Sequence, residues 1–102
     1  MASGPAQSTS LTVRWLPSAL RSYFQTIARV RDQDVFTASM MAQRVERASA
    51  VLLLQPEIGT LTPRAGTRRF AIPRTGHTIE YRVVGNELRI TSWARQTRRP
   101  RR

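Results

Sequence analysis

The apolar residues of this chain follow two different periods, and the change from one to the other most constrains the fold. Between about residues 16 and 54 they recur every three or four positions, as in an α-helix that buries one side. Pro56 and Gly59 end that pattern, and apolar and polar residues then alternate, as in strands covered on one face. A short alternating segment at residues 11–15 precedes the helical part. The order strand, helices, strands predicts a small α+β domain.

Two helices are expected, joined by the short polar segment 31–34. The first begins around Pro17, because proline is tolerated in the first turn of a helix. The second covers about residues 35–54, with Asp34 as its N-cap. The apolar stripe of the first helix is formed by Leu16, Leu20, Tyr23, Ile27 and Val30, and that of the second by Met41, Val45, Ala48 and Leu52. The two helices therefore form a hairpin whose apolar stripes need a sheet to cover.

Three antiparallel strands are expected after the helices, at residues 69–73, 77–84 and 87–93, with residues 61–66 as a loop. Gly85-Asn86 is a two-residue hairpin turn, which sets the register of the last two strands. In that register Tyr81 faces Ile90 and Val83 faces Leu88, giving a coherent core face.

On the opposite face of this hairpin, Arg82 lies across from Arg89. Like charges in direct register cost stability unless something anionic lies over them, although Glu80, placed diagonally, relieves part of that cost. A solvated surface and a binding site are therefore the alternatives. The same alternation points Arg69 and Arg14 outward, so that arginines from several strands share the sheet face away from the helices.

The charge balance predicts an anionic partner. All 17 basic side chains are arginine and only six acids oppose them, for a net charge of +11. Guanidinium groups bind phosphate and carboxylate groups in a planar fork, so nucleic acid and acidic protein are both candidates. A GC-rich genome explains the missing lysine but not the low number of acids. Salt-sensitive binding to nucleic acid follows from the net charge under every function considered below.

Composition excludes several classes of function. The sequence has no cysteine, which rules out disulfides, zinc–thiolate sites and thiol catalysis and fits a reducing cytoplasm. No apolar run approaches the roughly 18 residues of a membrane span. We expect residues 1–10 to form a flexible lead without signal-peptide features, 11–94 a single domain, and 95–102 an arginine-rich tail.

Few side chains offer chemistry. His77 is the sole histidine, so neither a metal site nor a Ser-His-Asp arrangement is expected, and nothing indicates a cofactor. Glu57 acts as a general base only if its loop folds toward the arginine face, and Tyr81 is expected in the core. Simple alternation along the last strand places Trp93 on its polar side, which favours contact with a partner.

Five segments of residues 11–100 resemble the RelE/ParE toxin superfamily, more closely its ParE side. They are Trp15-Leu-Pro-Ser-Ala19, Leu52-x-x-x-Pro56-x-x-Gly59, Thr67-Arg68-x-Phe70-x-Ile72-Pro73, Ile79-x-Tyr81-Arg82-Val83-x-Gly85-Asn86, and Leu88-x-Ile90 followed by Arg98-Arg99-Pro100. The resemblance implies a small sheet packed on a helical hairpin. It also implies a cytoplasmic type II toxin, neutralised in a hetero-oligomer by an acidic, ParD-like antitoxin that folds on the toxin's basic surface.

The superfamily divides in mechanism. ParE-like members are associated with blocking DNA gyrase, whereas RelE-like members cut mRNA on the ribosome with a basic cluster and a Tyr or His near the end. The family's frequent His falls on Arg95, and its common arginine of the second strand matches Arg68, although alternation favours Arg69 as the outward side chain. No agent of proton transfer is evident, so we expect a non-nucleolytic, ParE-like gyrase inhibitor.

Three alternatives stay open: a ribosome-dependent endoribonuclease, a small non-toxic nucleic-acid-binding protein, and a degenerate, weakly toxic relative. If the chain is a nuclease, its candidate catalytic residues are Arg68, Arg69, Arg82 and Arg95. The residues expected to bind the target or an anion are Arg68, Arg69, Arg82, Arg89, Arg95, Arg98 and Arg99. The residues expected to contact the antitoxin are Trp93, Arg82 and Arg89.

Overall fold

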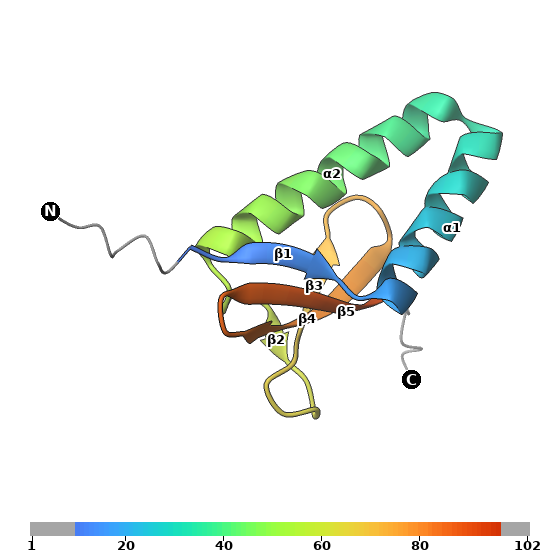
Figure 1. Cartoon of the computed structure of the whole chain (residues 1–102). Helices are drawn as coiled ribbons and strands as arrows, with labels where there is room; N and C mark the ends of the chain where they lie inside the picture. Colours follow the sequence, from blue (N-terminus) through green and yellow to red (C-terminus); the bar gives the residue numbers. More distant parts are fainter. Residues whose placement is uncertain (1–9, 97–102) are drawn as a thin grey trace, which may run out of the picture.

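Two helices lie on one face of a five-stranded sheet (Figure 1). The computed structural model describes residues 10–96. The elements are β1 (Thr12–Trp15), α1 (Pro17–Gln33), α2 (Val35–Leu54), β2 (Thr60–Leu61), β3 (Arg68–Ile72), β4 (His77–Val84) and β5 (Glu87–Arg95). The strands are ordered β1-β5-β4-β3-β2, with β1 parallel to β5 and the other neighbours antiparallel. The predicted α+β class and packing of the sheet on the helices are confirmed.

The helix α2 forms as the sequence predicts. One oxygen of the Asp34 carboxylate accepts the Phe36 N–H at 3.0 Å and the other accepts the Thr37 hydroxyl at 2.6 Å, which caps the helix. The hydrogen bond from Thr37, followed by that from Phe36, lowers the pKa of Asp34. The predicted stripe of Met41, Val45, Ala48 and Leu52 is buried. Burial of each of the larger side chains in this stripe, Met41, Val45 and Leu52, stabilises the folded state by about 2 kcal/mol.

The helix α1 packs on a line slightly different from the predicted one. Its buried residues are Ala19 and Thr26, whereas Tyr23, Ile27 and Val30 are only partly buried against the core. Thr26 is placed there by polar contacts, because its hydroxyl donates to the Ser22 carbonyl and accepts a bond from Trp93. A hydroxyl that is satisfied in this way can occupy an apolar interface, which periodicity of apolar residues does not predict.

The hairpin of β4 and β5 has the predicted register at its turn. Val84 faces Glu87, Val83 faces Leu88, and Tyr81 faces Ile90. The two-residue strand β2 pairs with β3 at positions where a turn and a loop were expected. Its pairing depends on where β3 lies in space, which a two-residue segment cannot signal in sequence.

A β-bulge overturns the expectation for Trp93. Glu80 faces Ser92 and Tyr81 faces Ile90, so Thr91 is an extra residue in β5, and its hydroxyl donates to the Glu80 carbonyl. The bulge reverses the alternation beyond it. Trp93 therefore points into the core with 6% of its surface exposed, and its prediction as a residue on the polar side is wrong.

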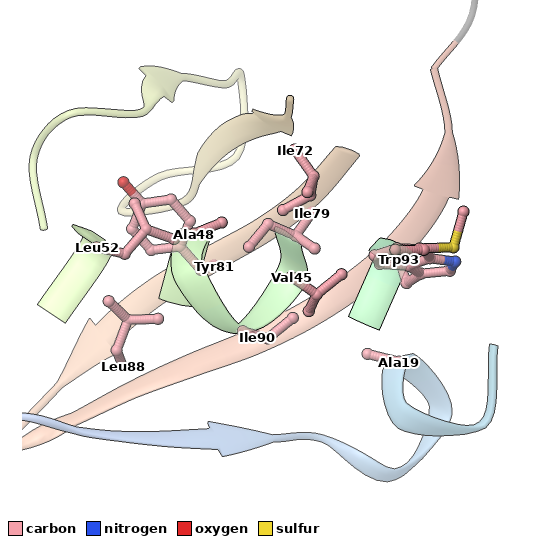
Figure 2. Close-up of a cluster of buried hydrophobic side chains, with 11 residues drawn as sticks. Ala19, Val45, Ala48, Leu52, Ile72, Ile79, Tyr81, Leu88, Ile90 and Trp93 are labelled. Carbon is pink, nitrogen blue, oxygen red and sulfur yellow. The ribbon is translucent and has the colours of Figure 1, made fainter. Parts of the chain in front are cut away.

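The core fills the space between the helices and the inner face of the sheet (Figure 2). Trp93 lies at its α1 end, where its indole Nε1 donates to the Thr26 hydroxyl at 3.0 Å. His77 stacks on the Trp93 ring at 4.8 Å between centroids, and the Tyr23 ring meets it edge-on at 4.8 Å. His77 is thus a buried packing residue whose Nδ1 donates to the Thr75 carbonyl.

At the other end of the core, Tyr81 secures the loop after α2. Its hydroxyl donates to the Pro56 carbonyl at 2.8 Å and accepts the Gly59 N–H at 3.0 Å (Figure 2 shows the hydroxyl pointing toward this loop). Burial raises the pKa of Tyr81, opposed by the hydrogen bond from Gly59 and the charge of Arg68. The prediction of Tyr81 as a core residue is confirmed, with 1% exposure.

Candidate anion-binding site

Three arginines stand in one row across the face of the sheet away from the helices. Arg14 on β1 is in register with Arg89 on β5, which is in register with Arg82 on β4. We call these three residues the arginine ladder. Because neighbouring strands are about 5 Å apart, the ladder places three guanidinium-bearing side chains within about 10 Å along the sheet.

One carboxylate partly balances the ladder. Arg89 Nε donates to Glu87 Oε1 at 2.9 Å, and Arg14 Nη1 lies 3.6 Å from Glu87 Oε2. The hydrogen bond from Arg89 is the main reason why the pKa of Glu87 is lowered; desolvation, the next largest cause, opposes it, and the charges of Arg14 and Arg89 lower the pKa further. Among residues 10–96, no acid lies within ion-pair distance of Arg82, which is exposed.

Glu80 forms its ion pair with Arg69 and not with Arg89, the expected partner. It lies directly across β3–β4 from Arg69, whose Nη2 and Nε approach Glu80 Oε2 at 2.7 and 3.2 Å. The expectation that Glu80 relieves Arg89 is therefore wrong, because a directly opposite partner on β3 takes the carboxylate.

Arg68 and Arg69 have separate roles that follow from strand alternation. Arg69 points outward and is exposed, as alternation predicts. Arg68 turns to the other side, where its Nη1 donates to the carbonyls of Gly59 at 2.8 Å and Glu57 at 3.0 Å. Arg68 therefore holds the loop after α2 together with Tyr81.

A polar cleft on the outer face adjoins the ladder. It is lined by Thr60, Arg69, Ala71, Thr78, Glu80, Ser92, Ala94, Arg95 and Gln96. The guanidinium groups and hydroxyls of this cleft can hold a phosphate group. Its single carboxylate is bound to Arg69, Tyr81 is buried with its hydroxyl engaged, and His77 is buried under the sheet. Arg98 and Arg99 lie outside the described residues.

A second surface, on the helical side, was not predicted. A groove between α2 and the β3–β4 turn has an apolar floor of Met40, Ala48, Val51, Phe70 and Pro73 and a rim of Arg44, Arg47 and Arg74. Arg74 adopts a left-handed backbone with φ of 63°, which is uncommon for a residue other than glycine. The spacing of Arg44 and Arg47 places both on one side of α2, which the sequence could indicate. That Arg74 of the β3–β4 turn lies beside them follows only from the folded structure.

Some kinds of site are not found in the described part of the chain. Residues 10–96 contain no group of three His, Asp or Glu side chains that could hold a metal ion. None of the helices in this part of the chain is both long and apolar enough to cross a membrane.

Comparison with known proteins identifies the fold. No protein-family model and no curated protein sequence match the chain. A chain of the chromosomal ParDE toxin–antitoxin system from P. aeruginosa superimposes with a TM-score of 0.74 and 18% identity, over 86% of this chain and 98% of that chain. The isolated RelE toxin of E. coli superimposes with a TM-score of 0.62 and 15% identity, over 87% of each chain. The chain therefore shares its fold with both structures, and its TM-score is higher with the ParDE chain than with RelE.

Proposed function

We propose that this protein is the toxin of a type II toxin–antitoxin pair and that it arrests growth in the cytoplasm by inhibiting DNA gyrase, without cutting RNA. The observation that carries the proposal is the structural similarity to a chain of a ParDE system, which extends over almost the whole of that chain. The net charge of +11 suits neutralisation by an acidic antitoxin.

The composition of the polar cleft favours inhibition over cleavage. RNA cleavage needs a group that moves a proton as well as groups that stabilise charge on the phosphate. Arg69 and Arg95 meet the second need, but the cleft contains no histidine and no free tyrosine hydroxyl among the described residues. Glu80 is the one acid there, and its Oε2 is occupied by Arg69.

The groove on the helical side is the proposed binding site for the antitoxin. An apolar floor bordered by Arg44, Arg47 and Arg74 suits an amphipathic segment that buries apolar side chains and presents acidic ones to the rim. Because Trp93 is buried, we do not retain it as an antitoxin contact. Arg82 and Arg89 remain proposed anion ligands.

The first experiment separates the two toxin mechanisms. The chain is expressed from a tightly repressed promoter, and labelled thymidine and methionine are followed over the first minutes. We expect DNA synthesis to stop while translation continues. Immediate loss of translation identifies an endoribonuclease, and no arrest at all leaves the non-toxic nucleic-acid-binding protein.

A paired variant sharpens this result. Arg69→Gln combined with Glu80→Gln replaces the ion pair of the cleft by two amides of similar size and removes no net charge. If the protein inhibits gyrase without cleavage, growth arrest persists in this variant. If the cleft is a nuclease site, arrest is relieved, because one of its two arginines and its one acid among the described residues are gone.

A further inference from the structure

We propose that the outer face of the sheet binds the sugar–phosphate backbone of nucleic acid, with the arginine ladder of Arg14, Arg89 and Arg82 at its centre. The inference goes beyond the proposed function, because it concerns binding by the purified protein and holds whether or not gyrase is the target.

The arginine ladder lowers the stability of the sheet when no anion is bound. Like charges directly opposite each other on neighbouring strands are destabilising, and here three share one row. Glu87 offsets one charge through its contacts with Arg89 and Arg14. The ladder therefore keeps a net charge of about +2 on a face with no helix over it, and an anion placed on the row removes that repulsion.

Side chains near the arginine ladder add further donors that can bind phosphate. Arg69 and Glu80 balance each other, but Arg95 adds a further exposed cation at the end of β5. The outward side chains of Thr78 and Ser92 line the cleft between these arginines. Hydroxyl and guanidinium groups are among the donors that contact phosphate oxygens.

The outer face lacks what a protein partner needs. Protein interfaces are anchored by buried aromatic or large apolar side chains, yet Trp15, Tyr81 and Trp93 all point to the helical side. The exposed large apolar residues lie on the helices, in the loop after α2, or at the core-side positions Leu61 and Val83. Interfaces with nucleic acid are polar and strongly positive, as this face is. The apolar groove on the helical side is the surface suited to a protein.

The lack of aromatic side chains on the described outer face also determines which part of the nucleic acid it contacts. Sequence-tolerant binding of single strands commonly uses aromatic side chains on which bases stack. The described outer face carries no aromatic side chain, so it contacts phosphates and sugars and does not distinguish bases.

The test is binding of a labelled thymidine oligonucleotide to the full chain, followed by fluorescence anisotropy over a series of salt concentrations. The ladder variant is Arg14→Gln with Arg82→Gln. The matched control is Arg21→Gln with Arg29→Gln, which removes the same charge from exposed positions of α1. We expect the ladder variant to lower the slope of log affinity against log salt by about 1.4, since each lost phosphate contact removes about 0.7 for a single strand. The control should keep the wild-type slope.

Equal losses of slope in both variants show that only net charge matters and overturn the proposal. An abasic oligonucleotide of equal length should bind as tightly as the thymidine one, and a strong loss also overturns it, because bases are then being read. A third contrary result is an unchanged slope for the ladder variant together with lost binding to a polyglutamate peptide, which makes the face a protein-binding one. Arg14→Lys with Arg82→Lys retains the charges, so it should keep the wild-type slope. A circular dichroism melt of the glutamine variant that matches the wild type shows that any loss of slope is not misfolding.

Discussion

At the scale of single residues, the contact between Tyr81 and the loop after α2 has the clearest consequence for stability. The Tyr81 hydroxyl satisfies both the Pro56 carbonyl and the Gly59 N–H inside the protein. Tyr81→Phe leaves both backbone groups without that partner, so we expect the free energy of unfolding to fall by about 2 kcal/mol. Urea denaturation measures this, and a change below about 0.5 kcal/mol would show that water replaces the hydroxyl.

Gly59 is required by the same contact. A β-carbon at this position would lie 2.6 Å from the Tyr81 hydroxyl oxygen and 2.9 Å from the Arg69 carbonyl oxygen. We expect Gly59→Ala to destabilise the protein, and to do so less in the Tyr81→Phe background, because part of the clash is with the hydroxyl. Urea denaturation of the two single variants and the double variant gives this coupling, and strict additivity would contradict it.

Glu87 gives the ladder a dependence on pH. Its pKa in the folded protein is lowered from the ordinary value of 4.5, chiefly by the hydrogen bond from Arg89. Its contribution to stability is therefore complete above that value and is lost as the pH falls through the folded-state pKa. Asp34, whose pKa is also lowered, acts in the same direction. We expect Glu87→Gln to flatten, but not abolish, the fall in melting temperature under acid conditions. Arg89→Gln should do the same, and a wild-type acid profile in both variants would contradict this account.

At the scale of elements, the bulge at Thr91 decides which way the end of β5 faces. Deleting Thr91 restores simple alternation and turns Trp93 out of the core, so we expect the deletion variant not to fold. Thr91→Ala keeps the length of the strand and loses only the hydroxyl contact with the Glu80 carbonyl. It should fold with a small loss of stability. Circular dichroism distinguishes the two variants, and a cooperatively folded deletion variant would argue against the role of the bulge.

Elements whose signals are local could be predicted from the sequence. The bounds of α2, its cap and stripe, and the register beside Gly85-Asn86 depend on neighbouring residues, and all agree with the structure. Trp93, β2 and the partner of Glu80 depend on how strands pair across the sheet, which no local pattern contains. Alternation within each strand predicted that Arg14, Arg82 and Arg89 point outward. Their alignment in one row could not be predicted, because it requires the parallel pairing of β1 with β5.

At the scale of the whole molecule, the sheet extends into the segment 95–102 that was expected to be a tail, because Arg95 is the last residue of β5. Arg95 pairs with His77, and the Gln96 N–H donates to the Gly76 carbonyl. We expect a chain ending at Gln96 to fold like the full chain and to bind nucleic acid with a lower salt slope, because the arginines beyond that point are gone. A chain ending at Trp93 loses strand pairing as well and should melt at a lower temperature. Equal melting temperatures would show that the end of β5 adds nothing to the fold.

The aromatic cluster where α1 meets β5 also makes this protein its own optical probe. Both tryptophans of the sequence lie there, with 6.4 Å between the Trp15 and Trp93 ring centroids. Tyr23 of α1 stacks on Trp15 at 5.1 Å. Intrinsic emission therefore arises from a single location and reports the docking of the helical hairpin on the sheet. The outer face and the apolar groove carry no tryptophan, so ligands that bind there can be titrated with extrinsic dyes while the native emission follows the integrity of the fold.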